Sequence, residues 1–478
     1  MKINSFIRDT MGLRSVEVEV SLTPGLPKIQ FLGLPDTLIK ESVLRIQSAI
    51  KYCGFKLPKS KQILIQLKPN YLKKSSQGLD LAVAAAILWE TEQIPKPKCQ
   101  SVSLYGELSL KGEILVPDDF QDLTELPSTD RFITGNLNSP QDFDIYSASK
   151  LTELAEPTFI SRQETSTQMV RPELLKIKIT KEQADILKII AVGEHPTILA
   201  GPPGTGKTTL ALLASSLLKN PDVETLRVSQ KISRHFGIPL AWRPIVSPHH
   251  TSTALAMIGG GTLPRPGEIT RAHGGVLIMD EFLEFDPTVQ EALREPMETG
   301  QMTIARGGHV QIYPAKFLLL ATTNLCPCGF LIPERDFECR GRVRYCHSSL
   351  QKLSGPMMDR FSMLLMSYKW GQNGNITLED VFKDVIQIQN SILKNRKQKI
   401  PNHYLKISDI ESQLSSFDKE VIAEVQEKSH RRYQALLRVA RTIADCEFSE
   451  KISTQHLEKA RDLTLTPFHI LRDFTRNY

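Results

Sequence analysis

The chain has 478 residues, 41% hydrophobic and 23% charged, so it is too long for one hydrophobic core and is expected to form about three domains. Its 59 Lys and Arg residues against 53 Asp and Glu give a formal net charge of +6, which permits binding to a phosphate backbone without by itself indicating nucleic acid. Apolar stretches fall well short of the roughly 20 residues that cross a bilayer, and residues 1–10 contain no signal-peptide core, so we expect a cytoplasmic protein.

The N-terminal part, residues 1–160, is expected to form a mixed α+β domain. Strand-like alternation of apolar residues and helix-like spacing follow one another here, separated by Pro and Gly turns. The predicted strands and helices lie at 16–34, 38–52, 63–67, 80–91, 102–110 and 113–116. After them, residues 161–178 begin with Ser, Thr and Gln and show little apolar periodicity, which predicts a linker.

The next segment carries a phosphate-binding pattern. A strand predicted at 197–200 runs into GPPGTGKT, residues 201–208, which matches G-x-x-x-x-G-K-[ST], and a helix is predicted at 208–218. The glycines let backbone N–H groups face phosphates at a helix N-terminus, Lys207 adds positive charge, and the Thr208 hydroxyl can bind Mg²⁺. The sequence therefore predicts ATP and Mg²⁺ as ligands. The expected nucleotide-binding residues are Gly201, Pro202, Pro203, Gly204, Thr205, Gly206, Lys207, Thr208 and Thr209.

A second apolar strand, predicted at 276–279, ends directly at Asp280 and Glu281. Taken alone, two acids after a strand are commonly a solvated pair, but their position downstream of a phosphate-binding loop favours a catalytic role. Asp280 is expected to hold Mg²⁺ together with Thr208. Glu281 is expected to orient and polarise the water that attacks the γ-phosphate, because phosphoryl transfer relies on positioning and charge stabilisation.

A cluster of four cysteines follows a third predicted strand at 317–321: Cys326, Cys328, Cys339 and Cys346. Four thiolates at short spacings can enclose one Zn²⁺ at low cost in loop closure, although the spacing is less regular than paired C-x-x-C motifs. A structural zinc site and a set of free thiols are both open interpretations, and the neighbouring His347 could replace one cysteine.

Helical periodicity dominates after about residue 370. We therefore expect a nucleotide-binding α/β domain at 179–372, which includes the cysteine-bearing insert, and a helical domain at 373–478. The helices predicted in the latter lie at 378–393, 418–448 and 454–464.

Longer motifs are spread over most of the chain. They are SPHH at 247–250, PRPGEI at 264–269, DEFLEF at 280–285, LSGPMMDR at 353–360 and RVARTIAD at 438–445. Together they resemble the magnesium-chelatase-like AAA+ ATPases of the ComM/YifB type. The resemblance implies an α/β fold, with an AAA+ P-loop domain and helical lid preceded by a Lon-protease-like α+β domain.

The resemblance also implies roles for three further residues. Asn324 looks like a sensor-1 residue that reaches the γ-phosphate or the water, and Arg431 resembles a sensor-2 residue of the lid. Arg360 looks like an arginine finger that reaches the nucleotide of a neighbouring subunit, which implies a homo-hexameric ring. The alternatives are an ordinary turn for Asn324 and surface or salt-bridged arginines for Arg360 and Arg431.

The N-terminal domain resembles the proteolytic domain of Lon-type proteases. The segments that carry this resemblance lie at 33–35, 78–81 and 105–108. In the matching register the nucleophilic serine of those proteases falls on Asp80 and its lysine partner on Leu123, so no Ser-Lys pair is expected and we predict no protease activity. Ser75 and Ser76 lie nearby without a base and are expected to be loop residues.

The family resemblance further implies ATP-driven movement on DNA, by a helicase that promotes branch migration in natural transformation or recombination. Residues 259–262 and 299–316 could project into the pore of a ring, where Arg306, His309 and Lys316 could meet phosphates. The alternative is a solvated hairpin used for subunit packing.

The competing function is that of a chelatase-like or MoxR-like ATPase that remodels a protein complex with the same nucleotide residues. The Lon-like N-terminal domain favours the ComM type. A module that binds ATP without turnover conflicts with the combined presence of Glu281, Asn324 and Arg360.

Overall fold

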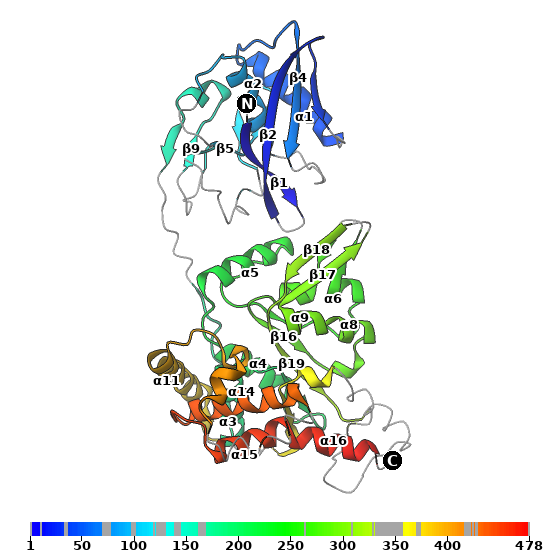
Figure 1. The fold of residues 1–478 in the computed structure, drawn as a ribbon, viewed down its shortest axis with the longest axis vertical. Coiled ribbons are helices and arrows are strands. Elements are labelled where there is room, and N and C mark those ends of the chain that lie inside the picture. The colour runs from blue at the N-terminus through cyan, green and yellow to red at the C-terminus, as the bar shows by residue number, and fades with distance from the viewer. Residues whose placement is uncertain are drawn as a thin grey trace. The chain divides into compact units, whose positions relative to one another are not determined.

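Most of the chain is described in the computed structural model, which covers residues 2–9, 12–32, 37–68, 78–96, 102–117, 120, 131–137, 145–160, 169–261, 264–306, 309–326, 329, 357–369, 374–414, 422, 425 and 429–476. Two compact units result, Met1–Gln168 and Met169–Tyr478 (Figure 1). Their boundary falls inside the segment predicted to be a linker. The predicted division of the second unit after residue 372 stays a prediction.

The N-terminal unit is built on an eight-stranded mixed sheet with the order β10-β9-β8-β5-β1-β2-β4-β3. Its strands are β1 (Lys2–Asp9), β2 (Gly12–Pro24), β3 (Ile29–Leu32), β4 (Lys61–Lys68), β5 (Val102–Leu104), β8 (Arg131–Thr134), β9 (Ile145–Ser147) and β10 (Thr158–Ile160). Strand β4 buries Ile63, Ile65 and Leu67 on one face, as a period of two predicts. A separate ribbon joins β6 (Glu107–Leu108) and β7 (Ile114–Leu115).

Among its described residues, this unit has two α-helices, α1 (Thr37–Tyr52) and α2 (Asp80–Glu90). Helix α2 is buried over nearly its whole length because its sequence, DLAVAAAILWE, is apolar on all sides. The sequence predicts one strand at 102–110, and that prediction is wrong in its length. Strand β5 ends at Leu104 because Gly106 leaves the sheet to exchange backbone hydrogen bonds with Gly78 and Leu81 at the start of α2.

The second unit contains a five-stranded, all-parallel sheet with the order β13-β16-β19-β12-β20. Its strands are β12 (Thr197–Ala200), β13 (Ile245–Val246), β16 (Val276–Met279), β19 (Leu318–Thr323) and β20 (Met363–Met366). Parallel strands end at the same edge of a sheet, so the residues that follow β16, β19 and β12 meet there. The topology thereby brings together three segments that are far apart in sequence.

The α-helices in the described part of this unit begin before β12 and continue to residue 476. They are α3 (Lys181–Gly193), α4 (Lys207–Leu217), α5 (Val223–His235), α6 (Ala254–Ile258), α7 (Glu268–Arg271), α8 (Pro287–Ala292), α9 (Arg294–Thr299), α11 (Leu378–Arg396), α12 (Ile407–Glu411), α14 (His430–Cys446), α15 (Thr454–Thr464) and α16 (Thr466–Arg476). Helix α14 begins at His430, whereas the sequence predicts a helix from residue 418. Ser429 is its N-cap, and the Ser429 hydroxyl accepts a hydrogen bond from the Arg432 amide.

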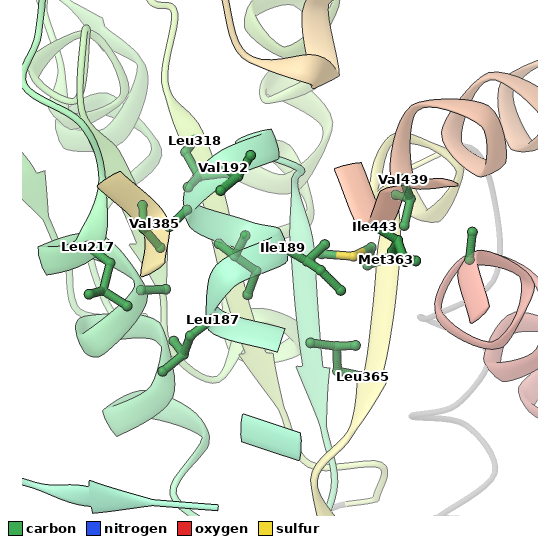
Figure 2. Packing of buried hydrophobic residues seen from close by; sticks show 14 of the residues in the cluster. Leu187, Ile189, Val192, Leu217, Leu318, Met363, Leu365, Val385, Val439 and Ile443 are labelled. Atoms are coloured by element: carbon green, nitrogen blue, oxygen red, sulfur yellow. The ribbon is translucent and has the colours of Figure 1, made fainter. Parts of the chain in front are cut away.

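One apolar core joins the parallel sheet to the C-terminal helices (Figure 2). Leu187 and Ile189 of α3 lie in it with Met363 of β20, and Val439 and Ile443 of α14 complete the cluster on the other side. All five are less than 9% exposed, so the helices predicted as a lid share their hydrophobic burial with the nucleotide-binding sheet.

A buried polar network reinforces this junction. His195, just before β12, is fully buried, and its Nε2 lies 2.8 Å from the Thr442 hydroxyl. Asn402 donates both to that hydroxyl, at 3.0 Å, and to Asp445 Oδ2, at 2.7 Å. Arg396 forms a bidentate pair with Asp445, at 2.5 and 2.7 Å. These hydrogen bonds and the ion pair connect α14 and α11 to the start of the phosphate-binding strand.

Burial of His273 predicts a pH dependence of stability. Its Nδ1 accepts the Lys316 amide at 3.1 Å, and burial lowers its pKa to about 4. Between pH 6.5 and about 4 the unfolded chain therefore binds a proton that the folded chain does not, so stability is lost as pH falls through this window. Over the whole window this group lowers the free energy of unfolding by up to about 3 kcal/mol.

We expect His273→Gln, which keeps an acceptor for the Lys316 amide, to show a shallower loss of stability from pH 7 to pH 4.5 than the unchanged chain. Chemical denaturation at the two pH values measures this slope. Parallel profiles for the two proteins would contradict the assignment.

Candidate nucleotide site

The loop after β12 has a backbone that only glycine adopts readily. Gly201, Gly204 and Gly206 have φ values of +147°, +78° and +79°. A Cβ on Gly201 would lie 2.3 Å from the hydroxyl of Ser367, the residue after β20, whereas Gly204 and Gly206 have open space at that point. The loop is held against β20 by Thr205, whose hydroxyl lies 2.6 Å from that of Ser367. The three glycines and Thr205 belong to the loop that is predicted to bind nucleotide.

Lys207 opens helix α4, and its side chain points back into the loop. Its ammonium group donates to the carbonyls of Gly201 and Pro202, at 2.9 and 2.8 Å, and to Asn324 Oδ1 at 3.1 Å. Burial lowers the pKa of Lys207, and the negative charges of Asp280 and Glu281 oppose that effect. The structure thus brings Lys207 and Asn324 together, with the cation among oxygen acceptors that phosphate oxygens can replace.

Asp280, after β16, links two threonines. Its Oδ1 accepts from the Thr208 hydroxyl at 2.8 Å and also from the Thr322 hydroxyl. The Thr322 hydroxyl in turn accepts the amide of Glu281 at 3.1 Å. A hydroxyl and a carboxylate in direct contact are the oxygen ligands that Mg²⁺ takes in nucleotide sites, so Thr208 and Asp280 fit the predicted metal.

Glu281 has a left-handed backbone with φ of +55°, unusual for a residue that is not glycine. Its side chain is 48% exposed, and its Oε2 lies 3.1 Å from Nδ1 of His250. The His250 ring stacks on that of His249, with centroids 4.2 Å apart. The carboxylates of Asp280 and Glu281 therefore have different partners, two threonines for Asp280 and a histidine for Glu281. Sequence reasoning missed the contact with His250, although SPHH was noted as a motif.

Arg360 and Arg431 form a second group, around Glu298 of α9. Both donate from Nη2 to the same oxygen, Glu298 Oε1, at 2.7 and 2.5 Å. Arg432 fixes the segment that carries Arg360, because it donates to the carbonyls of Met358 and Phe361 at 2.7 and 3.1 Å. Burial lowers the pKa of Arg432 to about 10. Sequence reasoning did not find Glu298 or Arg432.

The two loops predicted to face a pore lie beside each other. β14 (Gly259–Gly260) pairs with β15 (Arg265–Pro266), and β17 (Gln301–Arg306) pairs with β18 (His309–Pro314) in a hairpin next to α6 (Figure 1). The Tyr313 hydroxyl donates to the Pro264 carbonyl at 2.6 Å and joins the two ribbons.

The three basic residues predicted to meet phosphates occupy different places in this hairpin. Arg306 and His309 pair across its tip. Lys316 instead follows β18 at the base, and its ammonium lies 4.0 Å from the centre of the Tyr404 ring. Lys316 is exposed, and its contact with a phosphate stays a prediction.

In the N-terminal unit, Asp80 is the residue that the sequence register assigned to the place of a protease nucleophile, and this correspondence stays a prediction. Its side chain is fully buried, and its Oδ2 accepts from Arg45 Nε of α1 at 2.8 Å. Burial raises the pKa of Asp80, and Arg45 opposes this shift. An ion pair between two helices therefore stands at this position. Ser75, Ser76 and Leu123 lie outside the described residues.

The cysteine cluster lies largely outside the described part of the chain, which includes Cys326 but not Cys328, Cys339 or Cys346. Cys326 is buried after β19. Among the described residues, no group of three or more His, Cys, Asp or Glu side chains could hold a metal ion. The zinc site therefore stays a prediction.

Known protein families and individual proteins match most of this chain. Three family models match the chain: "Magnesium chelatase, subunit ChlI" over residues 173–373, "Subunit ChlI of Mg-chelatase" over 18–118, and "Magnesium chelatase, subunit ChlI C-terminal" over 379–463. YifB of Salmonella typhimurium is 32% identical over 95% of both chains, and the competence protein ComM of Haemophilus influenzae is 31% identical over 95% of this chain and 96% of its own.

The chain belongs to the ComM/YifB-type magnesium-chelatase-like AAA+ family. Its α/β AAA+ fold, predicted from the sequence, is confirmed. More distant partial matches are Lon protease 2 of Bacillus subtilis, 28% identical over 32% of this chain and 30% of its own, and probable DNA helicase MCM9 of Arabidopsis thaliana, 27% identical over 36% and 22%. No described helix is both long and apolar enough to cross a membrane.

In this AAA+ ATPase family member, the Thr322 hydroxyl is expected to matter for turnover. Thr322→Val removes a donor to Asp280 and the acceptor of the Glu281 amide, so both acids lose a restraint, and we expect kcat for ATP hydrolysis to fall about tenfold or more. Thr322→Ser keeps the hydroxyl and is the matched control, expected to retain most activity. Full turnover in the valine variant would show that this contact is dispensable.

Proposed function

We propose that this chain is an ATP-dependent, ring-forming DNA motor, a helicase or branch-migration protein of natural transformation or recombination. The observation that carries the ATPase part is the hydrogen-bonded group at one edge of the parallel sheet, where Lys207 contacts Asn324 and Asp280 contacts Thr208. A single triphosphate bound at this edge would contact all four of these side chains.

In the proposed mechanism, amides of the nucleotide loop and the Lys207 ammonium hold the β- and γ-phosphates. Thr208 and Asp280 would hold Mg²⁺, which offsets charge on the phosphates when it is bound. Glu281 orients the attacking water, and His250 restrains that carboxylate before nucleotide binds. When nucleotide binds, the Asn324 side chain exchanges its hydrogen bond with Lys207 for one with the γ-phosphate or the attacking water.

The proposed assembly is a homo-hexamer whose active sites lie between subunits. Arg360 and Arg431 converge on Glu298, as a separate group from Lys207 and its partners. This separation supports a role for Arg360 at the nucleotide of a neighbouring subunit, where a guanidinium offsets charge that develops in the transition state.

DNA as the substrate is supported by two lines. One is the length over which the chain matches the competence protein ComM, together with the partial match to probable DNA helicase MCM9. The other is the pair of joined ribbons, with Arg306 and His309 paired at the tip of the longer one and the exposed Arg265 on the shorter one. Basic side chains on projecting loops can track a phosphate backbone.

The competing proposal is an ATPase that remodels a protein complex. Residues 18–118, in the N-terminal domain, match a family model described as a magnesium-chelatase subunit. The presence of this domain therefore does not argue against a chelatase-like ATPase. Exposed apolar residues on the hairpin, Val310 at 66% and Ile312 at 53%, could equally contact a protein.

Turnover measured with and without DNA separates these proposals. For a DNA motor, single-stranded or branched DNA stimulates ATP hydrolysis several-fold, and Glu281→Gln lowers turnover about a hundredfold or more while ATP binding persists, because the carboxylate that orients the water is lost. ATPase activity that ignores every DNA tested would favour protein remodelling.

Mixing two inactive variants tests the shared active site. Lys207→Ala disables the nucleotide loop but keeps Arg360, whereas Arg360→Ala does the reverse. Each alone is expected to have little activity, and the mixture regains turnover because one subunit supplies the arginine to the nucleotide of the next. Co-purification of differently tagged subunits verifies that mixed rings form. If verified mixed rings stay inactive, the active site is not shared between subunits.

A further inference from the structure

Glu298 receives two arginines on one carboxylate oxygen. Its side chain is 45% exposed at the end of α9, yet Oε1 accepts Nη2 of Arg360 at 2.7 Å and Nη2 of Arg431 at 2.5 Å. The side chain of Arg360 is 11% exposed and that of Arg431 is 50% exposed. This cluster, which we call the Glu298 cluster, therefore reaches from the interior of the unit to its surface.

The three residues come from separate elements, and nothing local in sequence aligns them. Glu298 lies 62 residues from Arg360 and 133 residues from Arg431. Arg432 anchors the backbone on both sides of Arg360, and Arg431 is its neighbour at the start of α14. The backbones are thus fixed by other contacts, and the shared carboxylate fixes the two long side chains.

Electrostatics explains why an acid is needed at this point. Burial lowers the pKa of Arg360, Glu298 raises it in return, and the charge of Arg431 lowers it further. Two guanidinium groups repel each other, so without a negative charge between them they would separate toward solvent. A guanidinium has five N–H donors in a fixed plane. A carboxylate that accepts a hydrogen bond from one of them therefore restricts the orientation of the whole planar group.

We propose that Glu298 is a positioning residue, which holds Arg360 and Arg431 side by side so that both meet one anion, the polyphosphate of a nucleotide bound to a neighbouring subunit. This role rests on the proposed shared active site, and it assigns to Glu298 the orientation of the two arginines in that site. Because Glu298 acts through them, its loss is expected to slow the chemical step and leave nucleotide binding in its own loop intact.

The test compares three variants in steady-state ATP hydrolysis. Glu298→Gln keeps the volume but removes the charge, and we expect kcat to fall about tenfold with KM for ATP nearly unchanged. Glu298→Asp keeps the charge on a shorter side chain and should recover part of the loss. Glu291→Gln is the matched control on the preceding helix α8, where Glu291 pairs with Arg294, and should stay near wild-type activity.

Subunit mixing distinguishes positioning from a purely structural role. Lys207→Ala subunits retain the whole Glu298 cluster, so they should restore turnover at the intact nucleotide loops of Glu298→Gln subunits. Unchanged kcat in Glu298→Gln, or a loss of activity that parallels a lowered melting temperature, would overturn the proposal.

The same mixtures show which proposal fails. If Arg360→Ala is restored by Lys207→Ala subunits but Glu298→Gln is not, the positioning role is wrong and the shared site stands. If neither is restored, the shared site fails, and the role of Glu298 fails with it.

Discussion

The nucleotide site depends on one carboxylate shared between two hydroxyl groups. Asp280 accepts from Thr208 at the start of α4 and from Thr322 at the end of β19. This contact exists because β16, β19 and β12 are adjacent parallel strands whose carboxyl ends share an edge. The remaining geometry follows from it: Thr322 also binds the amide of Glu281, and this fixes the left-handed turn that sends the Glu281 side chain toward His250.

Helix α14 connects two groups of residues in the second unit, the segment that carries Arg360 and the residues just before β12. Near its start, Arg432 binds the carbonyls on either side of Arg360, while further along Thr442 contacts His195 just before the phosphate-binding strand. The helix shares the apolar core of α3 and β20 over the length between these contacts. A displacement of the helix would therefore be felt at both groups, since packed elements move as units.

The N-terminal unit is held together where α1 and α2 meet. The buried carboxylate of Asp80 pairs with the partly exposed Arg45, and Gly78 packs so closely on the Tyr105 ring that a Cβ would lie 2.1 Å from it. Removing Arg45 would leave the buried carboxylate without its counter-charge, which destabilises the folded unit.

The sequence by itself determined the local parts of this protein: the glycine-rich loop before α4, the acidic strand end at Asp280 and the α/β class of the second unit. Such parts are encoded by short-range periodicity and by residue types that have one chemical use, such as glycines at positive φ. Only the tertiary structure decided that Glu298 joins Arg360 to Arg431, that His250 faces Glu281, and that Lys316 lies on Tyr404. These contacts join residues far apart in the chain, and their geometry arises from strand order and helix packing, which a local sequence pattern does not specify.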